Sequence, residues 1–128
     1  MADMLRDGAA WLADQRRAFM SRTVTYQRGQ DEVDLPATIG QTVFNLTDEY
    51  GATIRHVTRD FLIAAEDLVI DGAFVEPRRG DRIRETTAGV TFVHEVIGMG
   101  GESAWRYSDR DRTTFRIHTK QIDREEAP

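Results

Sequence analysis

Apolar and polar positions alternate through most of the chain after residue 21, and this period of two predicts strands with one buried and one solvated face. Turn-forming residues such as Asp71-Gly72 separate the alternating runs. The runs lie at 23–26, 33–39, 54–63, 82–85, 90–97 and 113–119. Several short strands at regular intervals, with no long helix between them, are typical of an antiparallel β-barrel or β-sandwich.

The N-terminal segment follows a helical period instead. Its apolar residues at three-and-four spacing are Leu5, Ala9, Leu12 and Phe19. With Asp3 as a cap, this spacing predicts an α-helix over 3–20. A chain of 128 residues has the size of one domain, so we expect a single domain over 1–128. The predicted fold class is α+β, mainly β: a small antiparallel β-barrel or sandwich over 22–119 with one N-terminal α-helix and long loops.

Two long segments without a sustained period are predicted to be loops, at 40–53 and 98–112. The first contains several apolar residues, which is typical of a segment that becomes ordered against a partner. A short extra strand that folds back on the sheet is an equal alternative for it. The second begins with a glycine-rich stretch, and the acidic residues at 120–128 are expected to form a flexible tail.

The composition limits the classes of partner. The formal net charge of −5 disfavours tight, sequence-independent binding to duplex DNA, because such binding needs a concentrated positive surface. Lys120 is the single lysine among 17 basic residues, and arginine suits planar pairing with carboxylates across protein contacts, although a GC-rich genome explains the same bias. With no cysteine and no apolar run long enough to cross a bilayer, we expect a soluble protein without disulfides.

No residue pattern indicates catalysis, a metal or a cofactor. His56, His94 and His118 lie far apart in predicted strands, so we expect partly buried, hydrogen-bonded histidines rather than metal ligands. A strand follows the glycines at 98–101, whereas a phosphate cradle leads into a helix N-terminus. We therefore predict a protein that is not an enzyme, and no catalytic, cofactor-binding or metal residue.

Aromatic and arginine residues in and beside the predicted loops are candidate interface anchors. Trp, Tyr and Arg most often carry the binding energy of protein interfaces, and Trp105-Arg106-Tyr107 combines all three. Packing of these rings in the core is an equally open alternative. The candidate partner-binding residues are Phe44, Leu46, Tyr50, Arg55, Met99, Trp105, Arg106, Tyr107 and Arg110.

Several segments in a fixed order carry a resemblance to a known family. They are the leading helix Met4 to Phe19, Phe61-Leu62-Ile63 with Asp67-Leu68, Pro77 through Ile83, Phe92 to Val96 and Trp105 to Asp109. Their order resembles that of the small head-tail connector, or stopper, proteins of siphophages and related prophages. The resemblance implies a compact β-barrel with an N-terminal helix, which is stored as a monomer and assembles on the filled capsid as a ring, commonly a hexamer.

The resemblance also implies partners and a location. The partners would be the portal or adaptor ring and tail proteins, in the neck of the virion, after a stay in the cytoplasm of the bacterial host. Genomic DNA would pass without specific binding, and no membrane or cofactor is implied. The hypothesis is therefore a stopper that closes the packaged head and docks the tail by ring assembly. One alternative is a tail terminator or tail-completion protein, and the other is an OB-like barrel that binds single-stranded nucleic acid through Tyr26, Phe92 or Tyr107.

Overall fold

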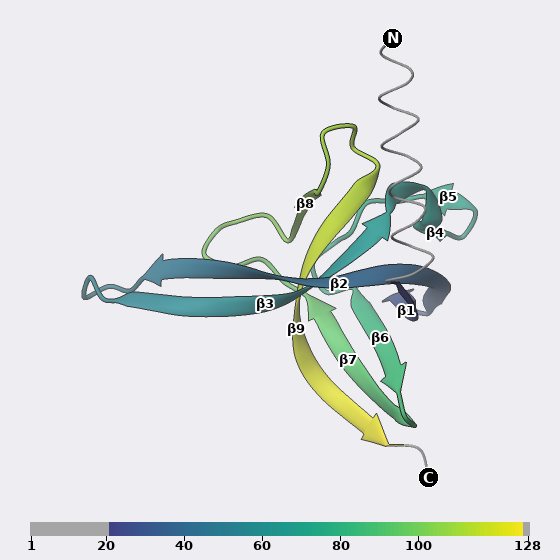
Figure 1. Cartoon of the computed structure of the whole chain (residues 1–128), viewed down its shortest axis with the longest axis horizontal. Coiled ribbons are helices and arrows are strands. Elements are labelled where there is room, and N and C mark those ends of the chain that lie inside the picture. Colours follow the sequence, from purple (N-terminus) through teal and green to yellow (C-terminus); the bar gives the residue numbers. More distant parts are fainter. Residues whose placement is uncertain (1–20, 127–128) are drawn as a thin grey trace.

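The computed structural model describes residues 21–126, which are almost entirely β-structure (Figure 1). The helical element among them is one short 3-10 turn, η1 (Ala65–Asp67). The strands are β1 (Arg22–Arg28), β2 (Asp31–Thr47), β3 (Thr53–Ala64), β4 (Val69–Ile70), β5 (Ala73–Phe74), β6 (Arg82–Thr87), β7 (Val90–Val96), β8 (Trp105–Tyr107) and β9 (Thr114–Glu126).

Seven strands form one antiparallel sheet in the order β3-β2-β1-β6-β7-β9-β8, and β3 also pairs with β9. β4 and β5 form a separate small hairpin. The turn between β4 and β5 is the predicted Asp71-Gly72, with φ of 53° and 77°. Positive φ at both residues is what a tight two-residue hairpin turn requires, and this is why the dipeptide is a strong turn signal.

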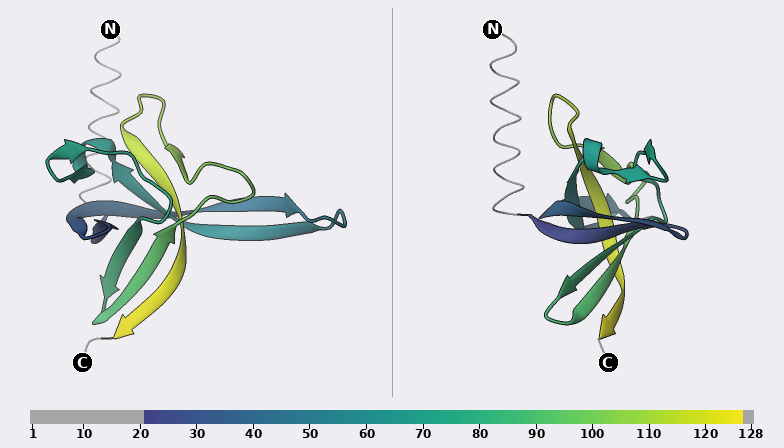
Figure 2. Two further views of the ribbon diagram at one scale, coloured as in Figure 1. Left: turned by 180° about the vertical axis from the view of Figure 1, so that it is seen from behind. Right: turned by 90° about the vertical axis from the view of Figure 1, so that its right-hand side faces the viewer.

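The two longest strands change partners part-way along. β2 pairs with β1 over residues 31–37 and with β3 over 38–47. β9 pairs with β3 over 114–119 and with β7 over 119–126. The strand halves therefore diverge from a common centre, as Figure 2 shows from two sides, and the sheet is not a true barrel. The predicted barrel or sandwich is wrong because a period of two shows that a face is buried, not which neighbour each half of a strand takes.

The predicted α+β class is also wrong for the described residues, which are β-structure apart from η1. The predicted helix over 3–20 lies outside the described residues. The expected flexible tail from residue 120 is strand up to Glu126, because backbone pairing with β7 extends β9 although its side chains there are exposed. A strand that is polar on both faces has no hydrophobic period by which a sequence can reveal it.

The core lies where the strands cross. Tyr26, Phe61, Ile63, Ile83 and Ile117 are fully buried there. They come from β1, β3, β6 and β9, and each lies on the inward face of its strand. The core thus ties together strands that are distant in the sequence.

β2 and β3 extend beyond this core as a long hairpin. The segment predicted as the first loop is mostly strand, because β2 continues to Thr47 and β3 begins at Thr53. We call residues 42–58 of this hairpin the arm. No other strand of the described residues pairs with β2 or β3 within the arm. Figure 1 shows the arm projecting away from the rest of the sheet.

Candidate functional site

The arm has two open backbone edges. An isolated two-stranded hairpin is only marginally stable in water, and an open edge presents unpaired N–H and C=O groups to any neighbouring strand. A hairpin of this length therefore needs support at its root, from other parts of its own chain, or from another molecule. This chain supplies the first two kinds of support, because ion pairs hold the root and one face of the arm packs on β9.

One face of the arm is exposed and carries an apolar pair. Val43 and Val57 lie directly opposite each other across the two strands and are 40% and 51% exposed. Their neighbours on this face, Asn45 and Arg55, are exposed as well. Contiguous apolar side chains that nothing in the described chain covers are typical of a surface that a partner completes.

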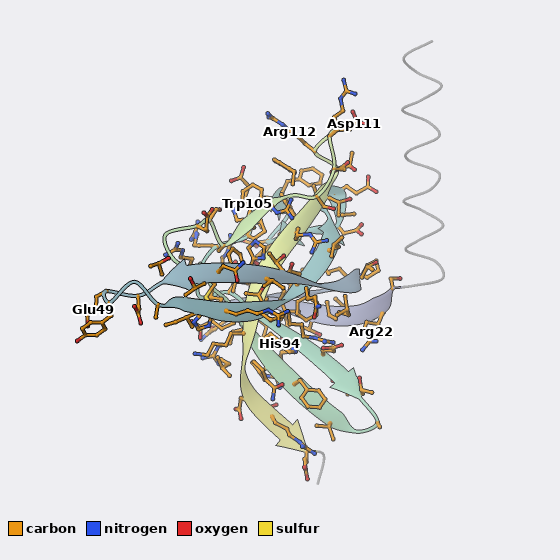
Figure 3. The ribbon with its side chains drawn as sticks, turned by 60° about the vertical axis from the view of Figure 1, so that its left-hand side comes forward. Arg22, Glu49, His94, Trp105, Asp111 and Arg112 are labelled. Carbon is orange, nitrogen blue, oxygen red and sulfur yellow. The ribbon has the colours of Figure 1, made fainter. Side chains whose placement is uncertain are left out.

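The tip of the arm is an ordered turn with exposed side chains. The Asp48 carboxylate accepts hydrogen bonds from the backbone N–H groups of Tyr50 at 2.9 Å and Ala52 at 2.8 Å, which fixes the turn. Glu49 and Tyr50 are exposed, and Tyr50 has 87% of its surface in solvent. Figure 3 shows Glu49 at the far end of the arm. The tip therefore presents one aromatic ring and one carboxylate.

The opposite face of the arm rests on other parts of the chain. The Phe44 ring lies edge-on to His118 of β9, with the ring centroids 5.1 Å apart. Gly100, in the loop between β7 and β8, lies so close to Leu46 that a Cβ on this glycine would clash with the leucine side chain. The two segments predicted to be loops therefore meet at this face.

A buried carboxylate holds the root of the arm on this same face. Asp60 is completely buried and accepts hydrogen bonds from the hydroxyls of Thr42 and Thr58. From β9, Arg116 Nη1 donates to Asp60 Oδ2 at 2.8 Å, and His118 Nδ1 lies 2.9 Å from Oδ1. We call Asp60, Thr42, Thr58, Arg116 and His118 the Asp60 cluster.

The bonds within the Asp60 cluster keep its carboxyl group ionised. Burial raises the pKa of Asp60, but the hydrogen bonds from His118, the two threonines and Arg116 outweigh burial and lower the pKa to about 2. The charged carboxylate therefore links β3 to β9 throughout the ordinary range of pH.

A second buried carboxylate holds the root on the other face. Glu85 of β6 receives a bidentate pair from Arg59 of β3, with Nε at 3.1 Å and Nη2 at 2.8 Å from its oxygens. Arg22 Nη1, at the start of β1, donates to Glu85 Oε2 at 2.6 Å. Burial raises the pKa of Glu85, but the two arginines outweigh burial and lower it. We call Glu85, Arg22, Arg59 and His94 the Glu85 cluster.

His94 lies in the Glu85 cluster without a hydrogen bond. Its Nε2 is 3.3 Å from Glu85 Oε1, yet neither ring nitrogen has hydrogen-bond geometry with any residue that the structure describes. Burial lowers the pKa of His94, so its ring is neutral at neutral pH, and it packs against Phe61. The expectation of a buried, hydrogen-bonded histidine is met by His118, whereas His94 is buried without a hydrogen bond and His56 is exposed.

The two clusters act on opposite faces of β3. Consecutive side chains of a strand point to opposite faces, so Arg59 reaches β6 while Asp60 reaches β9. Each cluster joins the root of the arm to a strand in the body of the sheet. Directional charge pairs on both sides therefore fix the direction in which the arm projects.

A cavity of about 230 Å³ opens onto the Glu85 cluster. All residues of the cluster line it, together with Thr87, Phe92 and Gln121. Two arginines and one carboxylate line it, so the walls carry a net positive charge. An anionic group in this cavity would meet guanidinium N–H groups and the unbonded ring of His94.

A third buried carboxylate, Asp81, lies away from the arm. It accepts a hydrogen bond from the phenolic hydroxyl of Tyr26 and a bidentate pair from Arg28. Burial, reinforced by Asp81, raises the pKa of Tyr26. Because Tyr26 is fully buried, its ring cannot stack on a base, and the nucleic-acid alternative loses one of the residues on which it depends.

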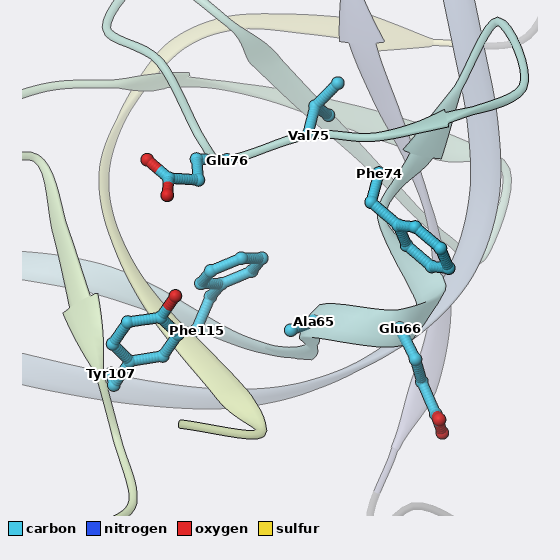
Figure 4. Close-up of a pocket in the computed structure, with 7 residues that line it drawn as sticks. All are labelled: Ala65, Glu66, Phe74, Val75, Glu76, Tyr107 and Phe115. Carbon is cyan, nitrogen blue, oxygen red and sulfur yellow. The ribbon is translucent and has the colours of Figure 1, made fainter. Parts of the chain in front are cut away.

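The aromatic residues of β8 pack on β9 and stay partly exposed. Trp105 meets Phe115 edge-on with ring centroids 5.0 Å apart, and Tyr107 stacks on Phe115 at 5.5 Å. Tyr107 and Phe115 also line a cavity of about 350 Å³, whose other lining residues include Glu66 and Glu76 (Figure 4). These rings therefore combine core packing with an accessible edge.

The remaining candidate residues lie on exposed or half-buried surface. Arg106 is exposed on β8, and Arg110 is exposed in the loop that follows β8. Arg55 is exposed on the arm, and Met99 is half-buried in the loop after β7. All the candidates thus lie on the arm, in the loop that touches it, or on β8 and the loop after it.

Other kinds of site lack their usual residues in the described part of the chain. Residues 21–126 contain no group of three or more side chains that could hold a metal ion. No helix within that range has the length and apolar character to span a bilayer. What the geometry offers is a projecting arm, a positively charged cavity and a partly exposed aromatic cluster.

The family model of the phage head-tail joining protein matches residues 2–126, nearly the whole chain. The chain belongs to this family. None of the curated proteins matches it. The resemblance found in the sequence is therefore confirmed: this is a structural protein of a bacteriophage, and its family implies contacts with head and tail components and a location in the virion.

Little in the sequence points to the two clusters at the root of the arm. A charged residue in a predicted strand is ordinarily assigned to the solvated face. The one signal is that Arg59 and Asp60 are adjacent charges directly before the apolar run Phe61-Leu62-Ile63, where consecutive side chains must face both sides of the sheet.

Proposed function

We propose that this member of the head-tail joining family is the stopper of the virion neck. It would assemble as a ring on the filled head, close it, and supply the surface on which the tail docks. The arm is the observation that carries the proposal. Its strand edges are open, its apolar pair Val43 and Val57 is exposed, and its root is held by charge pairs on two faces. An exposed hairpin with a fixed direction is suited to reach a neighbouring subunit.

A closed ring needs two different surfaces on every subunit. Each contact is heterologous: one surface of a subunit binds the other surface of the next subunit, and this contact repeats around the axis. The arm supplies one surface, with Phe44, Leu46, Tyr50 and Arg55, and the body of the next subunit supplies the other. The β8 region, with Trp105, Arg106, Tyr107 and Arg110 and the nearby Met99, is then left for the portal-side adaptor or the tail. We expect a hexamer in the particle and a monomer in isolation.

The charge of the chain fits a channel for DNA. A subunit with a net charge of −5 holds a passing duplex weakly, because retention depends on a concentrated positive surface. Arg59 and Arg116 at the arm root are paired with the buried carboxylates of Glu85 and Asp60. Genomic DNA would therefore slide past the ring without specific binding.

The test removes the outer arm and keeps its root. Residues 45–55 are replaced by Asn-Gly, which joins Phe44 to His56, its direct cross-strand partner, through the two-residue turn that hairpins favour. The contact of Phe44 with His118 and the Asp60 cluster are left intact. The expected result is a folded protein that no longer joins heads to tails, measured as loss of plaques in complementation of a phage that lacks the gene.

The matched control changes a turn elsewhere. Ala88→Asn gives the turn between β6 and β7 the same Asn-Gly sequence, and it should leave the plaque titre unchanged. A normal titre after removal of the outer arm overturns the proposal. Electron microscopy of lysates without the protein separates a stopper from a tail terminator, since the stopper predicts emptied heads beside tails of normal length, and the terminator predicts tails of irregular length.

A further inference from the structure

We propose that the arm tip of one subunit inserts Glu49 and Tyr50 into the cavity at the Glu85 cluster of a neighbouring subunit. The inference rests on the proposed ring and names the contact that closes it. The cavity and the tip are both present in the folded chain, so the contact needs no new secondary structure. Four observations carry it: the charge of the cavity, the unbonded His94, the exposed tip and the fixed root of the arm.

The cavity is suited to a carboxylate. The side chains of Arg22 and Arg59 are 51% and 38% exposed and face one buried carboxylate, Glu85, so one positive charge is left without a counterpart. Arg22 donates to Glu85 through Nη1, which leaves other guanidinium N–H groups for an incoming acceptor. A carboxylate from outside would neutralise the site.

His94 is an independent observation that points to a missing acceptor. Its ring is buried and lines the cavity, and neither of its nitrogens has a hydrogen-bond partner between residues 21 and 126. A buried polar group without a partner is destabilising, so native proteins seldom retain one that water or a ligand does not complete. An oxygen of the incoming carboxylate would accept a hydrogen bond from the ring N–H of neutral His94.

The arm tip carries the matching groups. Glu49 is exposed and makes no ion pair or hydrogen bond within the described chain. Tyr50 beside it is 87% exposed, and Phe92 in the cavity wall offers it an aromatic surface. The ordered turn at the tip limits the conformational freedom that would be lost on docking.

The contact must lie between subunits. Figure 3 shows Glu49 at the far end of the arm, whereas His94 and Arg22 lie in the body of the molecule. The two clusters at the root hold the arm away from its own body, so the tip does not fold back to its own cavity. A second copy of the chain is therefore the occupant.

Disulfide cross-linking tests the contact directly, because the chain has no cysteine of its own. Phage particles assembled with a chain that carries both Glu49→Cys and Gln121→Cys are treated with a mild oxidant and analysed without reduction. We expect a ladder of cross-linked subunits larger than the dimer, which neither single variant forms. The matched control pairs Gln121→Cys with Glu32→Cys, an exposed residue near the other end of β2, and should stay monomeric.

The outcomes separate the contact from the ring. If infectious particles with both cysteines contain only monomers after oxidation, the contact between tip and cavity is wrong. A ladder that stops at the dimer would support the contact and overturn the ring of the proposed function.

Charge reversal gives an independent measurement. Glu49→Arg places like charges together at the cavity and should lower the plaque titre by about tenfold or more. Arg22→Glu should do the same, and the double variant should recover most of the loss. If thermal unfolding shows that Arg22→Glu is unstable, Thr87→Glu brings a negative charge to the same cavity from an exposed position.

The removal of the outer arm tells the two proposals apart. If Glu49→Arg leaves the plaque titre unchanged while removal of the outer arm abolishes head-tail joining, the contact between tip and cavity is wrong and the proposed role of the arm is supported. If both changes are harmless, both proposals fall.

Discussion

Asp60→Asn tests whether the charge pairs at the root of the arm hold the fold. The amide keeps the size of the side chain but loses the negative charge that Arg116 and His118 face. The amide nitrogen of the asparagine can only donate, so it cannot accept the hydrogen bond that the Thr42 hydroxyl donates to Asp60. Arg116, whose side chain is mostly buried, is left with an uncompensated charge.

The pKa of Asp60 gives the size of the effect. This pKa falls from its ordinary 3.8 to about 2 in the folded protein, a difference of about 1.8, and each pKa unit corresponds to about 1.4 kcal/mol. Ionisation of the folded carboxyl group thus contributes about 2.5 kcal/mol. Removal of one partner of a buried ion pair costs about 3–5 kcal/mol, less where the other partner reaches water. We expect the free energy of unfolding at pH 7 to fall by about 2.5–4 kcal/mol.

The effect has a defined dependence on pH. Because the folded pKa of Asp60 is depressed, its contribution is complete above the unfolded pKa, near pH 4, and is lost as the pH falls towards 2. Urea denaturation of the wild type and of Asp60→Asn between pH 2 and 7 measures how their free energies of unfolding differ. The difference in free energy of unfolding between wild type and variant should be constant from about pH 7 to 5 and should become smaller below about pH 4.

Asp34→Asn is the matched control. Asp34 is exposed and accepts one hydrogen bond, from Thr25 Oγ1 at 2.6 Å, so its loss should change the free energy of unfolding by less than about 0.5 kcal/mol. The reasoning is refuted if Asp60→Asn costs no more than this control, or if the difference between wild type and variant does not narrow in acid.

Three further substitutions test the other buried groups. Tyr26→Phe removes the hydroxyl that donates to Asp81 and should lower the free energy of unfolding in urea by about 1–2 kcal/mol, and an unchanged value would contradict that bond. His94→Leu removes a ring without hydrogen bonds and should change the same quantity by less than about 1 kcal/mol at pH 7. Because burial lowers the pKa of His94, the wild type should lose stability as the pH falls through the ordinary value of 6.5, and a leucine variant that loses just as much would argue against this burial effect. Gly100→Ala puts a methyl group against Leu46 at a φ of 58° and should cost about 1 kcal/mol or more, with faster hydrogen exchange at the arm amides as the local readout.

The hydrophobic period located the strands that have one buried face. β1, β3, β6 and β7 lie within a few residues of the predicted ranges, because each places apolar side chains in the core, β3 through its inner part from Thr58 on. The same period fails where both faces of a strand meet water. The outer part of β9 is of this kind: its side chains from Lys120 on are exposed, and backbone pairing with β7 holds it. The outer part of β2 instead alternates exposed and half-buried side chains, and the predicted loop missed this alternation.

The candidate site was predictable only at its surface. Tyr50 stands out in the sequence because it is an aromatic residue in a segment without a sustained period, and it is exposed. The clusters at the root depend on partners that are far away in the chain, 56 residues for Asp60 with Arg116 and 26 residues for Arg59 with Glu85. No local pattern identifies such pairs, so only the folded structure shows that these charges are buried together.

The two clusters also connect the fold with the proposed function. A buried ion pair seldom adds net stability over apolar side chains of the same shape, so stability alone does not explain two such pairs at one root. Charge pairs are directional, however, and an arm that must meet a cavity on a neighbour needs a fixed direction. Joint replacement of Asp60, Arg116 and His118 by apolar residues should therefore keep the free energy of unfolding within about 1–2 kcal/mol and still reduce the plaque titre. If this variant joins heads to tails as well as the wild type, the charges at the root do not serve to direct the arm.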